Sequence, residues 1–389
     1  MTDISVPIFA KRQKRIQNMF STTKKTPHTI RKRMFAGLYS KTTLHASPEI
    51  RDISNKIVAQ RLLPIIDNAA RDRRSVDVLE VSLSLSMDFI TSYLFGVANC
   101  SDFLRDAGAR RQWLGAHGAT TGNGIWRPIL NSFLERVGVR PAPSAVVDEV
   151  TELCLELMKK ADISSSSTIP GVAGAGDKPI VYQQLSRALG ASPSLSTDDL
   201  RLTIASELMD HIKAGTETSG WTLVYLLHEM SQRPELQGSL RKEILHSLDP
   251  GSVPYYEPPS TTGGSEKCLE NVPSPRALDA LPLLDAIVLE TLRLHPAVPG
   301  SQPRVTPPPE KTNNFSLAGY TNLPPGIRIG AQAYSLHRNC DVFPDPESWN
   351  PERWLAADPK QTEQMMRWFW PFGSGSRMCV GNHFALLGG

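Results

Sequence analysis

The sequence predicts a mainly helical protein, and three observations carry that prediction. A helical hydrophobic period runs through residues 197–232, and a second one, bracketed by prolines, covers residues 283–295. The composition, 40% hydrophobic and 21% charged over 389 residues, is that of an ordinary globular protein. This length is enough for one large domain or two smaller ones.

The segment 197–232 has the clearest helix signals in the chain. Ser196-Thr-Asp-Asp199 is a typical capped start, and Leu200, Ile204 and Leu208 continue a helical period. Pro234 marks the end, because proline has no amide hydrogen with which to extend the helix. At about 1.5 Å per residue such a helix is about 50 Å long and should cross a whole domain.

The middle of this helix breaks the rules for a helix interior. Residues 214–219 read Ala-Gly-Thr-Glu-Thr-Ser, and a glycine there costs roughly 1 kcal/mol relative to alanine. Ala214 and Gly215 leave room for a bulky, flat partner, and the adjacent Glu217 and Thr218 can hold a water and pass protons. The alternative is a helix kink in which threonine hydroxyls bond back to carbonyl groups.

The second helix carries a charge pair on one face. Pro282 and Pro296 bracket it, and Glu290 and Arg293 lie three residues apart. Taken alone, this spacing favours an exposed pair worth a few tenths of a kcal/mol. Arg353, in the later segment Pro351-Glu-Arg-Trp354, is a candidate third member of the group.

Residues 372–381 read Phe-Gly-Ser-Gly-Ser-Arg-Met-Cys-Val-Gly and contain the most specific signal in the chain. Gly373 and Gly375 permit a tight turn and the close approach of a flat ligand. Arg377 places a positive charge two residues before Cys379, which favours the thiolate. A thiolate on such a loop can be an axial ligand of haem iron. The alternative is a buried cysteine that acts as a small hydrophobic residue.

Composition excludes several other classes of protein. The net charge of +3 is too small to indicate a nucleic-acid partner. The five cysteines are odd in number and widely spaced without any C-x-x-C, which argues against a disulfide framework and a structural zinc site. The sequence contains no run of 18 apolar residues, so no transmembrane helix is expected. Residues 1–20 lack the apolar stretch of a signal peptide.

Two kinds of segment have an unusual local composition. Residues 164–179 and 249–276, rich in Ser, Gly, Ala and Pro, are predicted to be mobile loops. The first 48 residues carry one acid against ten Lys and Arg. This basic segment is open to three interpretations: a nucleic-acid patch, a solvated basic helix, or a source of cations from residues 28–33 for haem propionates.

The motifs together resemble those of the cytochrome P450 superfamily. The loop matches its haem-binding signature F-x-x-G-x-R-x-C-x-G at five positions: Phe372, Gly375, Arg377, Cys379 and Gly381. Residues 290–293 are similar to its E-x-x-R motif, residues 351–354 to its P-E-R-[FW] motif, and residues 214–219 to its oxygen-activating stretch. The four motifs occur in the family's order, and the resemblance covers nearly the whole chain.

The resemblance implies a role for each of these residues. Cys379 is the expected axial ligand of haem b (iron protoporphyrin IX), with Phe372, Gly375, Ala214 and Gly215 bordering the cofactor. Thr218 and Glu217 are the expected catalytic residues, which supply protons during oxygen activation. The cations expected to hold the propionates are Arg377, Arg304, Arg31 and Lys32. Glu290, Arg293 and Arg353 are expected to form a buried structural triad, in which bidentate guanidinium geometry excludes lysine.

The resemblance also implies a fold and a reaction. We expect a single partial domain over residues 1–389, mainly α with a small β portion, and incomplete at the N- and C-termini. The expected reaction is monooxygenation, in which one atom of dioxygen enters an organic, lipophilic or secondary-metabolite substrate. Electrons are expected from NADPH-dependent cytochrome P450 reductase, and no nucleic acid takes part. The loop style and the contexts of Trp354 and His295-Pro296 resemble fungal members of the family.

Location and activity have alternatives at this stage. Family members of this type typically sit at the endoplasmic reticulum membrane, whereas this chain shows no anchor and is expected to be cytoplasmic or peripheral. One alternative activity is that of a haem-thiolate isomerase or dehydratase, which needs no external electrons; the Glu217–Thr218 pair argues against it. The other alternative is a catalytically inactive haem-binding remnant, and the missing ends argue for it.

Overall fold

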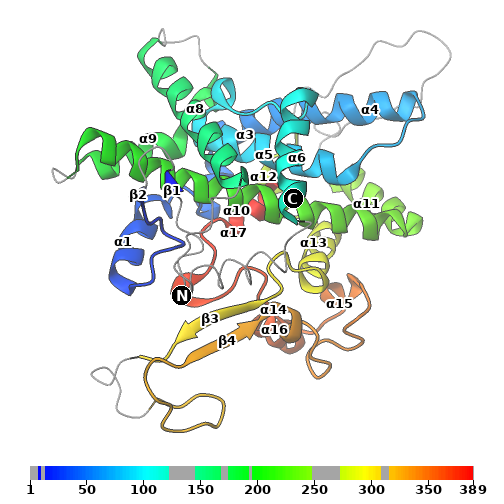
Figure 1. The fold of residues 1–389 in the computed structure, drawn as a ribbon. Coiled ribbons are helices and arrows are strands. Elements are labelled where there is room, and N and C mark those ends of the chain that lie inside the picture. The colour runs from blue at the N-terminus through cyan, green and yellow to red at the C-terminus, as the bar shows by residue number, and fades with distance from the viewer. Residues whose placement is uncertain are drawn as a thin grey trace, which may run out of the picture. The chain divides into compact units, whose positions relative to one another are not determined.

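The computed structural model describes residues 8–9, 14–121, 145–167, 174–191, 195–247, 272–307 and 315–388, and helices dominate them (Figure 1). The chain divides into two compact units. Unit 1 comprises Met1–Val224, Ile244–Ala280 and Val380–Gly389, and unit 2 comprises Tyr225–Glu243 and Leu281–Cys379. Parts of the two predicted loops, residues 168–173 and 249–271, lie outside the described residues.

Unit 1 is a helical assembly. Its helices are α1 (Lys25–Phe35), α2 (Lys41–Ala46), α3 (Pro48–Ser54), α4 (Leu63–Arg71), α5 (Val78–Phe95), α6 (Ala107–Thr121), α8 (Ala145–Ser167), α9 (Ile180–Gly190), α12 (Pro275–Leu278) and α17 (Asn382–Gly388). A π-helical stretch, Asn55–Leu62, joins α3 to α4. The short strands β1 (Ile8–Phe9) and β2 (Lys14–Arg15) pair antiparallel.

Helix α10 (Thr197–Ser231) begins in unit 1 and ends in unit 2. Helix α11 (Pro234–Ser247) begins in unit 2 and ends in unit 1. The predicted helix 197–232 is thereby confirmed. The hydroxyl of Ser196 accepts a hydrogen bond from the Asp199 amide at 3.2 Å, and Asp198 and Asp199 occupy the first turn. These groups satisfy free amides and complement the helix dipole, which explains why the helix starts there.

The core of unit 1 is built around α5. Asp77 caps its start through the Glu80 amide, and Gly96, with φ of +85°, ends it. By length and composition α5 could cross a membrane, yet 72% of this stretch is buried inside the fold, as is usual for a core helix. Its buried face packs with side chains of α8, α9 and α10, among them Leu157, Leu185 and Leu208.

Unit 2 contains α13 (Pro282–Leu294), α14 (Ala333–Leu336), α15 (Glu352–Leu355) and α16 (Pro359–Trp368), with a 3₁₀ turn at Gly375–Arg377. Strands β3 (Ser301–Val305) and β4 (Arg328–Gln332) form an antiparallel hairpin in which Arg304 lies opposite Ile329. The predicted fold class, mainly helical with a small β portion, is therefore confirmed. Helix α13 starts with Pro282 in its first turn and gives way at His295, as the bracketing prolines predict.

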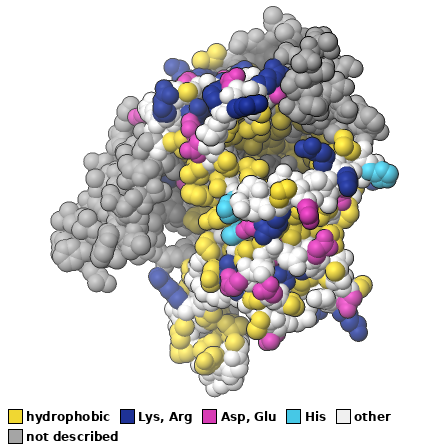
Figure 2. All heavy atoms as spheres, turned by 90° about the vertical axis from the view of Figure 1, so that its right-hand side faces the viewer, with side chains coloured by type: hydrophobic (Ala, Val, Ile, Leu, Met, Phe, Trp, Pro, Cys, Tyr) yellow, Lys and Arg dark blue, Asp and Glu magenta, His cyan; other side chains and the backbone are white. Residues whose placement is uncertain are grey.

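The far end of the β3–β4 hairpin exposes apolar side chains. Tyr320 is 71% exposed, and Val305, Leu317 and Ile327 are also exposed. Figure 2 shows hydrophobic side chains gathered on this projecting end of the molecule. Neither strand has a buried residue, so the hairpin contributes little to the core.

Candidate functional site

The loop around Cys379 has the tight geometry that its glycines predict. Gly373 and Gly375 adopt φ of +67° and +69°, a left-handed conformation that disfavours residues with a side chain. The Cys379 amide donates to the carbonyl of Phe372 at 2.9 Å, which closes the loop. Cys379 is exposed, and in the described part of the chain no atom beyond the two adjacent residues lies within 4 Å of the place where Gly375 would carry a Cβ. The loop therefore presents its sulfur outward beside bare backbone.

Two predicted propionate ligands lie near one another beside this loop. Arg304 is exposed on β3, and Arg377 is half-buried in the 3₁₀ turn. Burial lowers the pKa of Arg377, and the positive charge of Arg304 lowers it further. The same strand supports the loop through Gln302, whose Oε1 would lie 2.6 Å from a Cβ at Gly373. Strand β3 thus brings a second cation next to the first.

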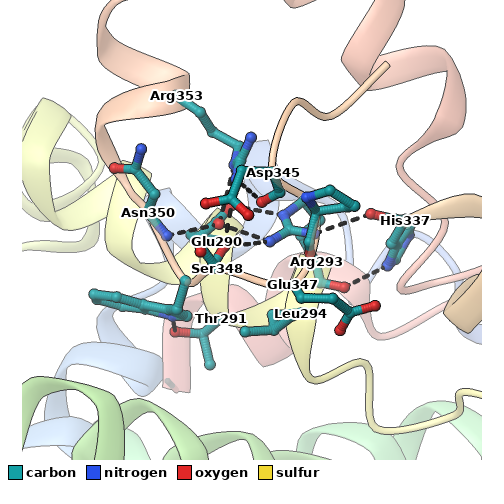
Figure 3. A network of polar contacts seen from close by, with 12 residues as sticks. Glu290, Thr291, Arg293, Leu294, His337, Asp345, Glu347, Ser348, Asn350 and Arg353 are labelled. Carbon is teal, nitrogen blue, oxygen red and sulfur yellow. Dashed lines mark hydrogen bonds and ion pairs between the residues drawn. The ribbon is translucent and has the colours of Figure 1, made fainter. Parts of the chain in front are cut away.

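The structure brings Glu290, Arg293 and Arg353 together in unit 2 (Figure 3). Arg293 binds both carboxylate oxygens of Glu290, at 2.9 Å through Nε and 2.8 Å through Nη2. Arg353 Nε lies 3.0 and 3.1 Å from the same two oxygens. Glu290 and Arg293 are both 0% exposed, so the pair is buried and not the exposed pair that spacing alone favours.

This triad also fixes the chain that leads toward the cysteine loop. Arg293 donates to the carbonyls of Pro346 at 2.8 Å and Ser348 at 2.9 Å. Arg353 Nη1 donates to the carbonyl of Pro344 at 2.8 Å. Two further donors reach Glu290: the Trp354 indole at 3.0 Å and the Asn350 amide at 2.8 Å. A buried carboxylate with this many donors is fully satisfied, which is the condition under which buried charge is tolerated.

Sequence reasoning missed His337, which lies directly after α14 and is fully buried. Its ring contacts the Arg293 carbonyl and the backbone amide of Trp370, two residues before the cysteine loop. No local pattern around His337 pointed to this position, because both partners lie more than 30 residues away in the chain.

The unusual segment of α10 is continuous helix, and its glycine has a packing role. A Cβ on Gly215 would lie 2.8 Å from Cγ1 of Ile90, so the glycine lets α10 approach α5 closely. Ala214 is exposed. The space beside Gly215 that was predicted to admit a flat ligand is thus occupied by Ile90 on the side of the helix that faces α5. The haem-contact roles of Ala214 and Gly215 stay predictions.

Thr218 shows the back-bonding that was the alternative interpretation. Its hydroxyl donates to the carbonyl of Ala214 at 2.6 Å, and Thr222 donates to the carbonyl of Thr218 at 2.8 Å. A hydroxyl whose hydrogen is used in this way still has lone pairs that accept from a water. The back bond is the hydrogen bond that the alternative interpretation predicts, and it remains compatible with a water-holding role.

Glu217 lies near a second ionisable residue that sequence reasoning did not single out. Glu217 and Lys213 both line a shallow surface depression, together with Met87, Trp113, Val150, Ile212 and Thr216. Burial lowers the pKa of Lys213, and the negative charges of Glu217 and Asp210 oppose that shift. The acid of the predicted proton-supplying pair is therefore electrostatically coupled to a lysine on its own helix.

The two predicted cations from the N-terminal segment lie on α1. Arg31 forms an ion pair with the buried Glu207 of α10, an acceptor that the sequence did not reveal. Lys32 is half-buried on the same helix. The propionate-binding roles of Arg31 and Lys32 stay predictions, and the pair with Glu207 gives Arg31 a role in holding α1 against α10.

Comparison with known proteins decides the family. The family model for cytochrome P450 matches residues 190–388, a range that holds the α10 segment, the triad and the cysteine loop. The chain belongs to the cytochrome P450 family. The predicted family membership is therefore confirmed.

Relatives of this P450 come from fungi and mammals. Cytochrome P450 monooxygenase avaI of Aspergillus versicolor is 26% identical over 95% of this chain and 81% of its own length. The mitochondrial 25-hydroxyvitamin D-1 alpha hydroxylase of Homo sapiens is 34% identical over 48% of this chain and 31% of its own length. Cytochrome P450 monooxygenase orf2 of Aspergillus niger is 35% identical, and the match spans only 32% of its length.

A solved structure supports the fold. The crystal structure of a cytochrome P450, CYP102L1, superposes with a TM-score of 0.66 and covers 95% of this chain and 72% of that chain, at 16% identity. At this identity the likeness concerns the fold alone. The P450 fold of the chain thus follows from both comparisons.

The residues of unit 2 fit the haem that this family implies. The sulfur of Cys379 is exposed on a turn with bare glycine backbone, which suits a flat macrocycle. Arg304 and Arg377 are close enough to repel one another, and an anionic group between two guanidinium groups would relieve that repulsion. A ligand that combines a metal with two carboxylates matches this donor set.

Proposed function

We propose that this P450 is a haem-thiolate monooxygenase whose axial ligand is Cys379. The observation that carries the proposal is the exposed thiol on the closed, glycine-shaped loop. Cys100 and Cys154 differ, because burial raises the pKa of each thiol and disfavours its thiolate. Cys340 is exposed but lies outside the haem-binding signature, and Cys268 lies outside the described residues.

In this proposal haem b binds with its propionates at Arg304 and Arg377. The bound haem supplies the oxygen-activating chemistry, and the thiolate increases electron density at iron. The residues of the chain hold and orient this group: Cys379 through its sulfur, and the two arginines through charge-assisted hydrogen bonds. Thr218 accepts a hydrogen bond from a water, and Glu217 gives and takes up protons.

The proposed reaction is a balanced monooxygenation. An organic C–H bond, dioxygen, two electrons and two protons give an alcohol and water. The electrons come from NADPH through cytochrome P450 reductase, and the chain acts in the cytoplasm or at the periphery of the endoplasmic reticulum membrane. A small lipophilic or secondary-metabolite substrate is supported by the names of the relatives, which include monooxygenases of Aspergillus species and a hydroxylase of 25-hydroxyvitamin D.

The test is the spectrum of the reduced, carbon-monoxide-treated protein. Wild type reconstituted with haem should show the red-shifted Soret band of thiolate ligation, and Cys379→Ala should lose it. Cys340→Ala is the matched control, because Cys340 is an exposed cysteine of the same unit and should leave the band in place. An unchanged band in Cys379→Ala would refute the ligand assignment.

A further inference from the structure

His337 connects two parts of unit 2 that are distant in sequence. Its Nδ1 lies 2.8 Å from the carbonyl oxygen of Arg293, on α13. Its Nε2 lies 2.6 Å from the backbone nitrogen of Trp370, which precedes the cysteine loop. One imidazole ring therefore spans from the triad helix to the start of the loop that carries Cys379.

The two partners determine the protonation state of the ring. The carbonyl of Arg293 can only accept, so Nδ1 carries the hydrogen and donates it. The amide of Trp370 can only donate, so Nε2 accepts with its lone pair. The imidazole is thus neutral in one tautomer, and a proton on Nε2 would face the N–H of Trp370 and break that hydrogen bond.

Packing fixes the orientation of the ring as well. Phe369 stacks on His337 with centroids 5.5 Å apart and an interplanar angle of 23°, and Phe343 meets it edge-on at 6.5 Å. The backbone carbonyl of His337 accepts from Arg293 Nη1 at 2.9 Å, so the two residues bind each other in both directions (Figure 3). The ring has no freedom to turn without loss of these contacts.

We propose that His337 is a positioning residue, whose neutral imidazole couples the Glu290–Arg293 pair to the cysteine loop and fixes the loop before haem binds. The part that concerns haem rests on the proposed function. Core packing alone needs only a ring of this size, which a phenylalanine would supply without either hydrogen bond. The geometry assigns the coupling to the two ring nitrogens.

Burial, together with two nearby arginines, favours the neutral form of His337 by lowering its pKa. Burial lowers the pKa of His337 to about 4, and the positive charges of Arg293 and Arg338 act in the same direction. The Arg293 carbonyl and the negative charge of Glu290 oppose this shift. Phe369 and Phe343, the rings packed on the other sides, add no titratable group.

The first test measures amide hydrogen exchange in residues 369–379 of the full-length, haem-free protein. His337→Phe keeps an aromatic ring but removes both hydrogen bonds, and exchange in this segment should become faster by on the order of tenfold or more. His228→Phe is the matched control, because His228 is an exposed histidine of the same unit. It should leave the exchange rate of this segment within a factor of two, roughly the measurement's reproducibility.

Two milder variants keep the proposal testable if His337→Phe does not fold. The amide of glutamine can donate to the Arg293 carbonyl and accept from the Trp370 amide, so His337→Gln should retain most of the protection. His337→Asn is one methylene shorter and cannot reach both partners. Protection at 369–379 should therefore be greater for glutamine than for asparagine, and equal exchange rates in these two variants would overturn the proposal.

The second test uses haem and separates the two proposals. With equal haem content, His337→Phe should convert a larger share of the reduced carbon-monoxide complex to the unshifted band of a lost thiolate ligand, and His337→Gln should restore the shifted band. If wild type shows no shifted band, the proposed function fails, and the exchange measurement still decides the role of His337. Unchanged exchange with an intact shifted band in His337→Phe would limit His337 to core packing.

Discussion

Glu290 in unit 2 and Glu207 in unit 1 are both buried, but their carboxylates have different sets of hydrogen-bond donors. In unit 2, Glu290 receives hydrogen bonds from two arginines, an indole and a backbone amide. In unit 1, Glu207 receives Arg31 and the Met19 amide, and burial raises the pKa of the Glu207 carboxyl above its usual value. The comparison teaches that two carboxylates can be equally buried and yet differ in how many donors compensate the loss of water, and Glu207 has the fewer of the two.

The neighbours of these acids extend the contrast. Burial and the charge of Glu207 raise the pKa of Asp210 to about 7. His211, the next residue, donates or accepts at Nδ1 with the Tyr39 hydroxyl at 2.7 Å, and its Nε2 has no hydrogen-bond partner among the described residues. In unit 2, by contrast, both nitrogens of the buried His337 are bonded. The α10 segment of unit 1 is thus the less completely satisfied of the two regions.

The largest expected effect is the loss of the buried arginine. Arg293→Ala removes one of the two arginines that bind the buried Glu290 and leaves the carbonyls of Pro346 and Ser348 without this donor, and unit 2 should lose about 3–5 kcal/mol of stability. Arg367→Ala is the control, since Arg367 pairs with Glu363 at 2.6 Å but the two side chains are 73% and 65% exposed. It should cost about 0.5 kcal/mol or less. Urea unfolding followed in unit 2 measures both, and equal costs would contradict the buried-triad interpretation.

A pH-dependent effect is expected next, in unit 1. The folded state holds the proton of Asp210 up to about pH 7, whereas the unfolded chain releases it near pH 4. This contribution is therefore present in acid and is lost as pH rises from about 4 to about 7, by on the order of 1–3 kcal/mol. Asp210→Asn should remove the loss, and Asp72→Asn, at an exposed position, should not.

Because His211 also titrates in this pH range, the effect of Asp210 has to be measured as the difference in stability between wild type and Asp210→Asn. Burial lowers the pKa of His211 to about 4, so its contribution to stability is gained as pH rises from about 4 to about 6.5. The two neighbours thus have opposite slopes in the same pH window, and the wild-type curve alone hides both. A difference curve of wild type minus Asp210→Asn that stays flat between pH 4 and 7 would show that Asp210 does not hold its proton in the fold.

A pair of glycine substitutions tests the close approach of α10 to α5. Both Gly215→Ala and Gly238→Ala gain helix propensity of about 1 kcal/mol. At Gly215 the new Cβ would lie 2.8 Å from Ile90, whereas at Gly238 no atom of the described residues outside the local helix turn lies within 4 Å. Gly215→Ala should therefore be less stable than Gly238→Ala by about 1–3 kcal/mol in thermal unfolding. Equal stabilities of the two variants would mean that the side chain of Ile90 can move away from the new Cβ without loss of stability.

The smallest effect on stability is expected at Thr218. Its hydroxyl bonds back to Ala214, and removal of such a bond in Thr218→Ala should change stability by about 0.5 kcal/mol or less. The coupling of NADPH consumption to product formation should change more. Under the proposed function, Thr218→Ala should form less product and more hydrogen peroxide per NADPH consumed. Thr222→Ala, which removes the next back bond on α10, is the control. Unchanged coupling in Thr218→Ala would remove the proton role and favour the isomerase alternative.

Local sequence determined several features of this protein without tertiary information. The capped start at Ser196 and the breaker Pro234 give α10 its bounds, because capping and proline act within one helical turn. The glycines at 373 and 375 set the turn of the cysteine loop for the same reason. The family followed from four short motifs, each of which needs only the order of its residues.

Only the tertiary structure decided which partners these residues meet. The spacing of Glu290 and Arg293 alone favoured an exposed pair, whereas in the folded protein both residues are buried. His337 meets Arg293 across 44 residues, and Arg31 meets Glu207 across 176. Gly215 proved to face Ile90 of α5. The physical reason is that burial and hydrogen-bond partners depend on which distant segments pack together, and a helical period states which face is apolar but not what will cover it.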